Sequence, residues 1–162
     1  MAGPPRDQVV DIECGKSFLA AFAARDWAAL ESVFASEAQL RAVIPKSERP
    51  FRDRTGAAAC ANQIRVWFQE ADVFEILDSD VTTLVDRVHL QYRVRVHEPE
   101  GWSIVEQHLY LTPGADGIRF CNLLCSGFRP IPNPTAEEIA LTSTGAQGLG
   151  ALGQERPSPA LT

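Results

Sequence analysis

The chain has 162 residues, of which 45% are hydrophobic and 22% are charged, and its formal net charge at pH 7 is −6. These values are typical of a single globular domain with a sizeable core. The acidic balance, without any long run of Lys or Arg, argues against nucleic acid and anionic membrane surfaces as partners.

The start of the chain and its apolar runs indicate a cytoplasmic protein. The N-terminal segment MAGPPRDQ lacks the apolar stretch of a secretory signal. No apolar run approaches the ~20 residues that a membrane span needs. The four cysteines are consistent with reduced thiols in an intracellular protein.

The period of the apolar residues predicts three helices in the first half of the chain, over residues 8–24, 27–35 and 56–71. Asp26 is typical of an N-cap for the second helix, and Thr55 is expected to cap the third. A short strand over 40–44 and a polar loop over 46–54 are predicted between those two helices.

From Val73 onward the period of the apolar residues changes to two, which indicates β-structure. Four strands are predicted, over residues 73–84, 87–97, 102–111 and 118–128. Helices followed by a run of antiparallel strands predict an α+β fold, with three N-terminal helices packed on one face of a curved antiparallel sheet.

The end of the chain differs in composition from the rest. Residues 130–162 hold five of the eleven prolines and no aromatic residue. We therefore expect a disordered N-terminus over 1–7, a folded domain over 8–130, and a mostly disordered tail over 131–162 with a helical turn or two over 136–143.

Residues 87–111 can be paired as a hairpin around a turn over 98–101, with His97 opposite Trp102. One face of this hairpin then consists mainly of Val and Leu, with Tyr92 and Gln107 opposite each other as its central polar pair. Burying a hydroxyl or an amide without a partner costs roughly 1–3 kcal/mol, so both side chains should have partners. Two interpretations remain open and can coexist: the two side chains bond to each other, or they orient a ligand.

The other face of the hairpin carries the charged and imidazole side chains. Glu106 lies opposite Arg93, which predicts a cross-strand ion pair at the surface. His108 and His89 share this face, so we expect His108 in solvent or at a dimer interface. His108 becomes a catalytic candidate if a β-bulge turns it inward.

The order of elements, the helix–helix turn containing RDW, and the final strands ending DGI…LLCSGFRP resemble the nuclear-transport-factor-2-like superfamily, and in particular its SnoaL-like domains. The resemblance covers about residues 8–130. It implies a cone-shaped α+β roll of the cystatin-like kind, with a small-molecule pocket inside and frequent dimerisation through the sheet. This fold serves isomerases, cyclases, dehydratases and non-catalytic binding modules alike.

The catalytic groups of such families do not transfer to this sequence. The positions that match their acids, bases and hydroxyls carry apolar residues instead, namely Phe18, Phe22, Ala42 and Leu123. Because no carboxylate is expected on the apolar side of the sheet, the catalytic residues are unknown, with Tyr92 and His108 as the remaining candidates.

The resemblance implies a pocket whose candidate ligand-binding residues are Tyr92, Gln107, Phe18, Phe22, Trp67, Arg41 and Asn122. Phe18, Phe22 and Trp67 have core packing as an equally simple role, and Arg41 is typical of a solvated strand residue. Alternation alone does not decide whether Asn122 or its neighbour Cys121 faces inward.

We expect no metal and no cofactor. Cys121 and Cys125 are ~13 Å apart along a strand, too far to share one zinc ion. The glycines from Gly148 to Gly153 match a dinucleotide-binding pattern, but no predicted strand precedes them and Pro157 interrupts the helix that such a site needs after its glycines.

The sequence thus predicts a SnoaL-like domain that binds a small apolar ligand, with its catalytic status undecided. The alternative is an isomerase, cyclase or dehydratase that acts on a small apolar carbonyl compound. As partners we expect that ligand and a second copy of the chain, bound through the sheet face that carries His89, Arg93 and His108, and neither nucleic acid nor membrane.

Overall fold

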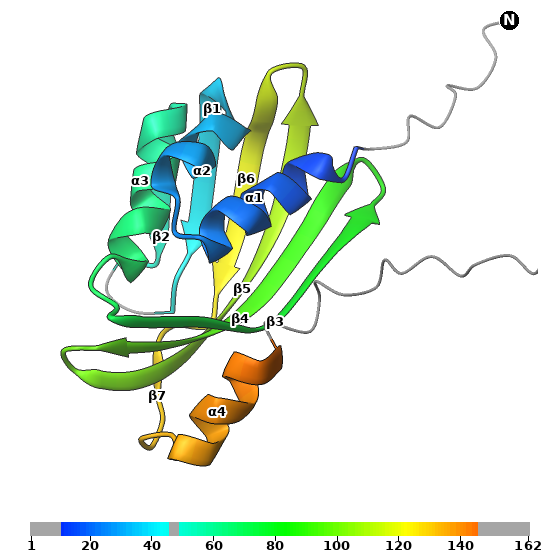
Figure 1. Ribbon diagram of the computed structural model, residues 1–162. Helices are drawn as coiled ribbons and strands as arrows, with labels where there is room; N and C mark the ends of the chain where they lie inside the picture. Colours follow the sequence, from blue (N-terminus) through cyan, green and yellow to red (C-terminus); the bar gives the residue numbers. More distant parts are fainter. Residues whose placement is uncertain (1–10, 46–48, 146–162) are drawn as a thin grey trace, which may run out of the picture. The chain divides into compact units, whose positions relative to one another are not determined.

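The computed structural model describes residues 11–45 and 49–145 (Figure 1). The chain divides into two compact units, Met1–Ile131 and Pro132–Thr162. The second unit contains α4 (Ala136–Gly145), a longer helix than the turn or two expected there. The predicted disorder over 1–7 and the glycine-rich segment from Gly148 to Gly153 lie outside the described residues.

The three predicted N-terminal helices are confirmed as α1 (Glu13–Ala23), α2 (Trp27–Val33) and α3 (Ala57–Phe68). Asp26 caps α2 as expected, because its side chain accepts a hydrogen bond from the backbone N–H of Ala29 at 2.9 Å. Between α1 and α2, Arg25 adopts a positive φ of 54° and donates to the carbonyl oxygens of Phe68 and Ala71, both at 2.8 Å. This side chain ties the turn to the end of α3.

The region between α2 and α3 differs from the prediction. The chain enters β1 (Phe34–Val43) directly after α2, so this strand begins six residues before position 40. Part of the predicted polar loop forms β2 (Phe51–Thr55), which pairs with β1 in antiparallel orientation. Thr55 does not cap α3: it ends β2, and Gly56 takes the N-cap position with a φ of 96°, a backbone conformation that a glycine adopts without strain.

The remaining strands are β3 (Val73–Leu84), β4 (Arg87–Glu98), β5 (Gly101–Gly114), β6 (Gly117–Cys125) and β7 (Arg129–Pro130). Among the described residues they complete a seven-stranded sheet in the order β2-β1-β6-β5-β4-β3, with β7 paired to β5. Figure 1 shows α1, α2 and α3 on one face of this curved sheet, which confirms the α+β class. One expectation is corrected: β1 and β6 run parallel, so the sheet is mixed.

The predicted register of the β4–β5 hairpin is confirmed over its whole length, including Tyr92 opposite Gln107 and His97 opposite Trp102. The face toward the helices, called the inner face below, is buried along most of the hairpin. Its apolar residues are all 0% exposed: Val88, Leu90, Val94, Val96, Val105, Leu109 and Leu111. They pack with Phe18 and Phe22 of α1 into one hydrophobic core.

Candidate functional site

A cavity of about 470 Å³ opens at one end of the inner face, and we call it the mouth cavity. It lies where the end of α3, the β4–β5 turn and the segment after β6 meet. Its apolar lining consists of Ile44, Pro45, Trp67, Phe128 and Pro130. The volume falls within the range of roughly 300–1,000 Å³ that is usual for small-molecule sites.

Three carboxylates also line the mouth cavity: Glu70, Glu98 and Glu100. Glu98 is half-buried at the end of β4, whereas the other two are exposed. Burial raises the pKa of Glu98 above its ordinary value, and the negative charges of Glu100 and Glu70 raise it further. The site therefore holds a carboxyl group that binds its proton more tightly than a free glutamate does.

Glu98 corrects the expectation that no carboxylate faces the apolar side. The turn predicted from the sequence covers residues 98–101, but the ladder continues to a pair between Glu98 and Gly101. Glu98 is six residues after Tyr92, an even spacing that places both side chains on the inner face. The alternation of β4, extended by one residue beyond His97, was the signal that could have found it.

Tyr92 and Gln107 bond to each other, as the first of the two interpretations proposed. The Tyr92 hydroxyl donates to Gln107 Oε1 at 2.5 Å, and Gln107 Nε2 lies 3.5 Å from Cys125 Sγ as a donor. Cys125 in turn lines the mouth cavity. Burial raises the pKa of Tyr92 well above its ordinary value, so the phenol keeps the proton that it donates. A direct role of the pair in ligand binding stays a prediction.

The predicted aromatic residues separate into two groups. Phe18 and Phe22 are 0% exposed, and the Phe22 ring stacks on Tyr92 with 4.4 Å between ring centroids. Trp67 is half-buried and lines the mouth cavity. The structure thus places Phe18 and Phe22 in the core and brings only Trp67 of the three to the cavity.

Arg41 and Asn122 lie on the opposite face of the sheet, called the outer face below. They are register partners on β1 and β6, whereas Cys121 and Leu123 point inward and are each 1% exposed. Arg41 Nε donates to Asp53 Oδ1 at 3.0 Å in an exposed ion pair. Asn122 therefore does not neighbour Gln107, and Cys125 occupies that place instead.

His108 also lies on the outer face, because the β4–β5 ladder continues past it without a bulge. Its Nδ1 is 3.1 Å from His89 Nε2, and the two rings stack. The predicted surface ion pair between Arg93 and Glu106 is confirmed, with 2.6 Å between Arg93 Nε and Glu106 Oε1. His108 is thus separated from the mouth cavity by the sheet.

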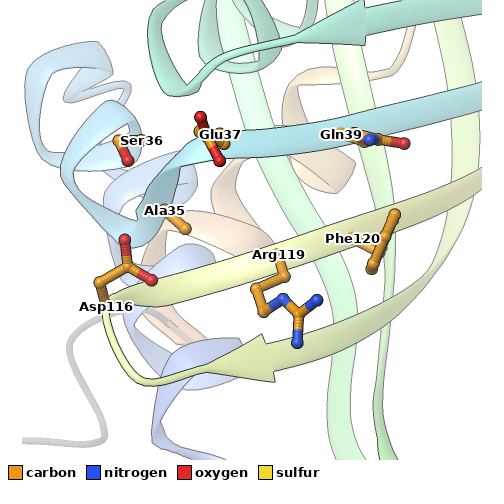
Figure 2. A pocket seen from close by; sticks show the side chains of 7 residues that line it. All are labelled: Ala35, Ser36, Glu37, Gln39, Asp116, Arg119 and Phe120. Atoms are coloured by element: carbon orange, nitrogen blue, oxygen red, sulfur yellow. The ribbon is translucent and has the colours of Figure 1, made fainter.

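A second, smaller cavity of about 240 Å³ lies along β1 and β6. Figure 2 shows its side chains, which come from β1 (Ala35, Ser36, Glu37, Gln39), the turn before β6 (Asp116) and β6 itself (Arg119, Phe120). Most of them are exposed and polar, and they carry charges of both signs. The mouth cavity is larger and more apolar, so it is the better candidate for a small-molecule site.

The described residues contain neither a cluster of metal ligands nor a membrane-spanning helix. No three His, Cys, Asp or Glu side chains in residues 11–45 and 49–145 lie close enough together to hold a metal ion. No helix in the described part of the chain is both long and apolar enough to cross a lipid bilayer.

Solved structures with the same fold come from several bacteria. A nuclear-transport-factor-2-like protein from Burkholderia xenovorans aligns with a TM-score of 0.55 and 14% identity, over 81% of this chain and 93% of its own. A candidate polyketide cyclase from Xanthomonas campestris aligns with a TM-score of 0.55 and 16% identity, over 69% of this chain and 87% of its own. A third structure is a protein of ketosteroid-isomerase-like fold from Catenulispora acidiphila, solved with trimethylamine. It aligns with a TM-score of 0.53 and 12% identity, over 82% of this chain and 92% of its own.

No family model matches the sequence. No curated protein matches it either. The structural likeness establishes the nuclear-transport-factor-2-like fold that the order of elements predicted, and at these identities it establishes the fold alone.

Proposed function

We propose that this chain, with its nuclear-transport-factor-2-like fold, binds a small apolar molecule in the mouth cavity. The observation that carries the proposal is the cavity itself, which has a suitable volume and an apolar lining that includes Trp67 and Phe128. Cys125 connects this lining to the bonded pair of Tyr92 and Gln107. A change in that pair is therefore expected to reach the ligand through Cys125.

The proposal is tested by placing the same substitution in the mouth cavity and in the smaller cavity along β1 and β6. Ser103→Leu fills the mouth cavity, and Ser36→Leu, its matched control, alters the smaller cavity on β1. The probe is 4-phenyl-2-butanone, a neutral apolar carbonyl compound. We expect the probe to raise the melting temperature of the unchanged chain and of Ser36→Leu, and not that of Ser103→Leu. A probe effect that survives Ser103→Leu would place the site elsewhere.

One observation favours the alternative, an isomerase, cyclase or dehydratase. Glu98 is a half-buried carboxyl at the cavity whose pKa is raised by burial and by the charges of Glu100 and Glu70, and a positioned carboxyl of this kind suits a group that takes and returns a proton. The corresponding test is exchange of the probe's α-hydrogens with heavy water. Exchange that the chain accelerates and that Glu98→Gln abolishes would favour the enzyme, and exchange at the uncatalysed rate would favour a binding module.

We further propose that two copies of the chain associate through the outer face. His89, Tyr110 and His108 form a stacked group there, and Leu124, the register partner of His108, is 49% exposed. Aromatic residues are enriched at protein–protein interfaces, and here an exposed leucine lies beside them. We expect a dimeric mass in solution that Leu124→Glu converts to the monomer. A monomer at micromolar concentration of the unchanged chain would contradict this.

A further inference from the structure

We propose that the ligand of the mouth cavity is an organic cation, a protonated or quaternary amine attached to an apolar body. This inference rests on the proposed function and specifies the ligand for the same site. The cavity defines the site, and the charges around it decide which ligands it accepts. The two questions can therefore be tested separately.

The charge of the cavity lining has a single sign. Glu70, Glu98 and Glu100 line it, and no Lys, Arg or His does so among the described residues. Arg129 lies between two lining residues but is the register partner of Ile104 on the outer face, so its side chain points away. A positively charged group of a ligand in the cavity would therefore face three carboxylates and, among the described residues, no cationic side chain.

The end of α3 does not add to this negative potential, because a cationic side chain already occupies it. The C-terminus of a helix carries a partial negative charge, and Trp67 belongs to the last turn of this twelve-residue helix. Arg25 already donates to the carbonyl oxygens of Phe68, Gln69 and Ala71 around this helix end. The guanidinium of Arg25 therefore offsets the partial negative charge of this helix end, and the preference for a cation rests on the three carboxylates.

The aromatic lining suits a cationic head and an apolar body together. Trp67 has the indole face that attracts a cation most strongly among aromatic side chains. Phe128, another lining residue, packs against Phe68 of the core with 5.6 Å between ring centroids. Ile44, Pro45 and Pro130 supply apolar surface for a hydrocarbon group.

An organic cation fits better than a metal ion. No three carboxylate, imidazole or thiol side chains among the described residues are close enough together to coordinate one ion. The three glutamates are spread around an opening of about 470 Å³, a space suited to a molecule of several heavy atoms. Burial is the largest cause of the raised pKa of Glu98, and the neighbouring charges of Glu100 and Glu70 raise it further.

The test compares three probes that share one body and differ in charge: 4-phenylbutylamine, 4-phenylbutan-1-ol and 4-phenylbutyrate. Binding to the full chain is measured by calorimetry at neutral pH and low salt. We expect the amine to bind about tenfold more tightly than the alcohol, and the carboxylate to bind most weakly. Added salt should reduce the advantage of the amine, because it screens the exposed carboxylates.

Two double variants with equal changes of net charge provide the control. Glu98→Gln with Glu100→Gln removes charge at the mouth cavity, whereas Glu13→Gln with Glu31→Gln removes it from exposed positions on α1 and α2. We expect the first to bring the affinity for the amine to within about threefold of that for the alcohol, and the second to leave the preference intact.

The outcomes separate this inference from the proposed function. Equal or tighter binding of the alcohol or the carboxylate would overturn the cationic ligand and leave the apolar site standing. An amine preference unchanged by the Glu98/Glu100 double variant would also overturn it. If none of the three probes binds, the mouth cavity is not a ligand site, and the proposed function fails together with this inference.

Discussion

The two ends of the hairpin's inner face differ in what covers them. Where β4 begins, α1 lies so close that a Cβ atom on Gly15 would be 2.7 Å from Val88 Cγ1 and 2.8 Å from Val81 Cγ1. Where β4 ends, Glu98 and Ser103 line the mouth cavity instead. One alternating pattern therefore produces a closed end and an open end. The alternation of apolar residues along the strands determines which face of the hairpin is buried. The position of α1 determines which end of that face becomes core and which end lines the cavity.

The largest expected effect comes from disturbing the closed end. Gly15→Val should destabilise the fold by about 3 kcal/mol, because the new side chain has no space between α1 and the valines of β3 and β4. Ser17→Val, at an exposed position of the same helix, controls for helix propensity and should change stability by less than about 0.5 kcal/mol. Denaturant unfolding measures both, and equal effects would mean that the closed end is not tightly packed.

The middle of the same face is tested by Tyr92→Phe. This change leaves the buried Oε1 of Gln107 without its donor and should cost about 1–2 kcal/mol in unfolding free energy. Combining it with Gln107→Met removes the unpaired group, so the double variant should regain most of the loss. Additive losses in this double-mutant cycle would show that the hydrogen bond contributes nothing.

A smaller effect is expected at the open end. The pKa of Glu98 is higher in the folded chain than in the unfolded chain, so ionisation of Glu98 with rising pH lowers stability. Glu98→Gln should therefore raise the melting temperature slightly at neutral pH, and the gain should disappear on acidification below the pKa of an ordinary glutamate. A gain that is the same at all pH values would show that the carboxylate charge is not its cause.

The smallest effect concerns the second unit of the chain. The contacts divide the chain between Ile131 and Pro132. Ending the chain after Pro132 should therefore leave the melting temperature and the probe-binding properties of the open end nearly unchanged. A large drop in melting temperature would show that the removed residues stabilise the first unit.

The local parts of the fold could be predicted from the sequence. The hairpin register followed from the turn and from the period of two, and Asp26 marked the start of α2. β2 was not predicted because Phe51–Thr55 is a short strand with three charged residues, which resembles a loop in composition. The parallel pairing of β1 with β6 joins segments about eighty residues apart in sequence, and no local pattern encodes such a pairing.

The candidate site was less predictable for a related reason. Trp67 and Cys125 meet Glu98 only because the end of α3, the segment after β6 and the β4–β5 turn converge in space. Tyr92 and Gln107 were recognisable as a polar pair, but the sequence did not show that their hydrogen bonds lead to Cys125. Arg41 and Asn122 were placed correctly on strands, while the face to which they point depended on the long-range pairing of those strands.

The bonded pair of Tyr92 and Gln107 has a consequence for strand alignment. A slip of β4 against β5 by two residues would keep every side chain on its face, and in one direction it would still match Leu90 with Leu111 and Val96 with Val105. Such a slip would place Tyr92 opposite Val105 or Leu109, and both polar groups would be buried without partners. The hydrogen bond between Tyr92 and Gln107 therefore favours one register of β4 against β5 over the others that the apolar pattern alone would accept.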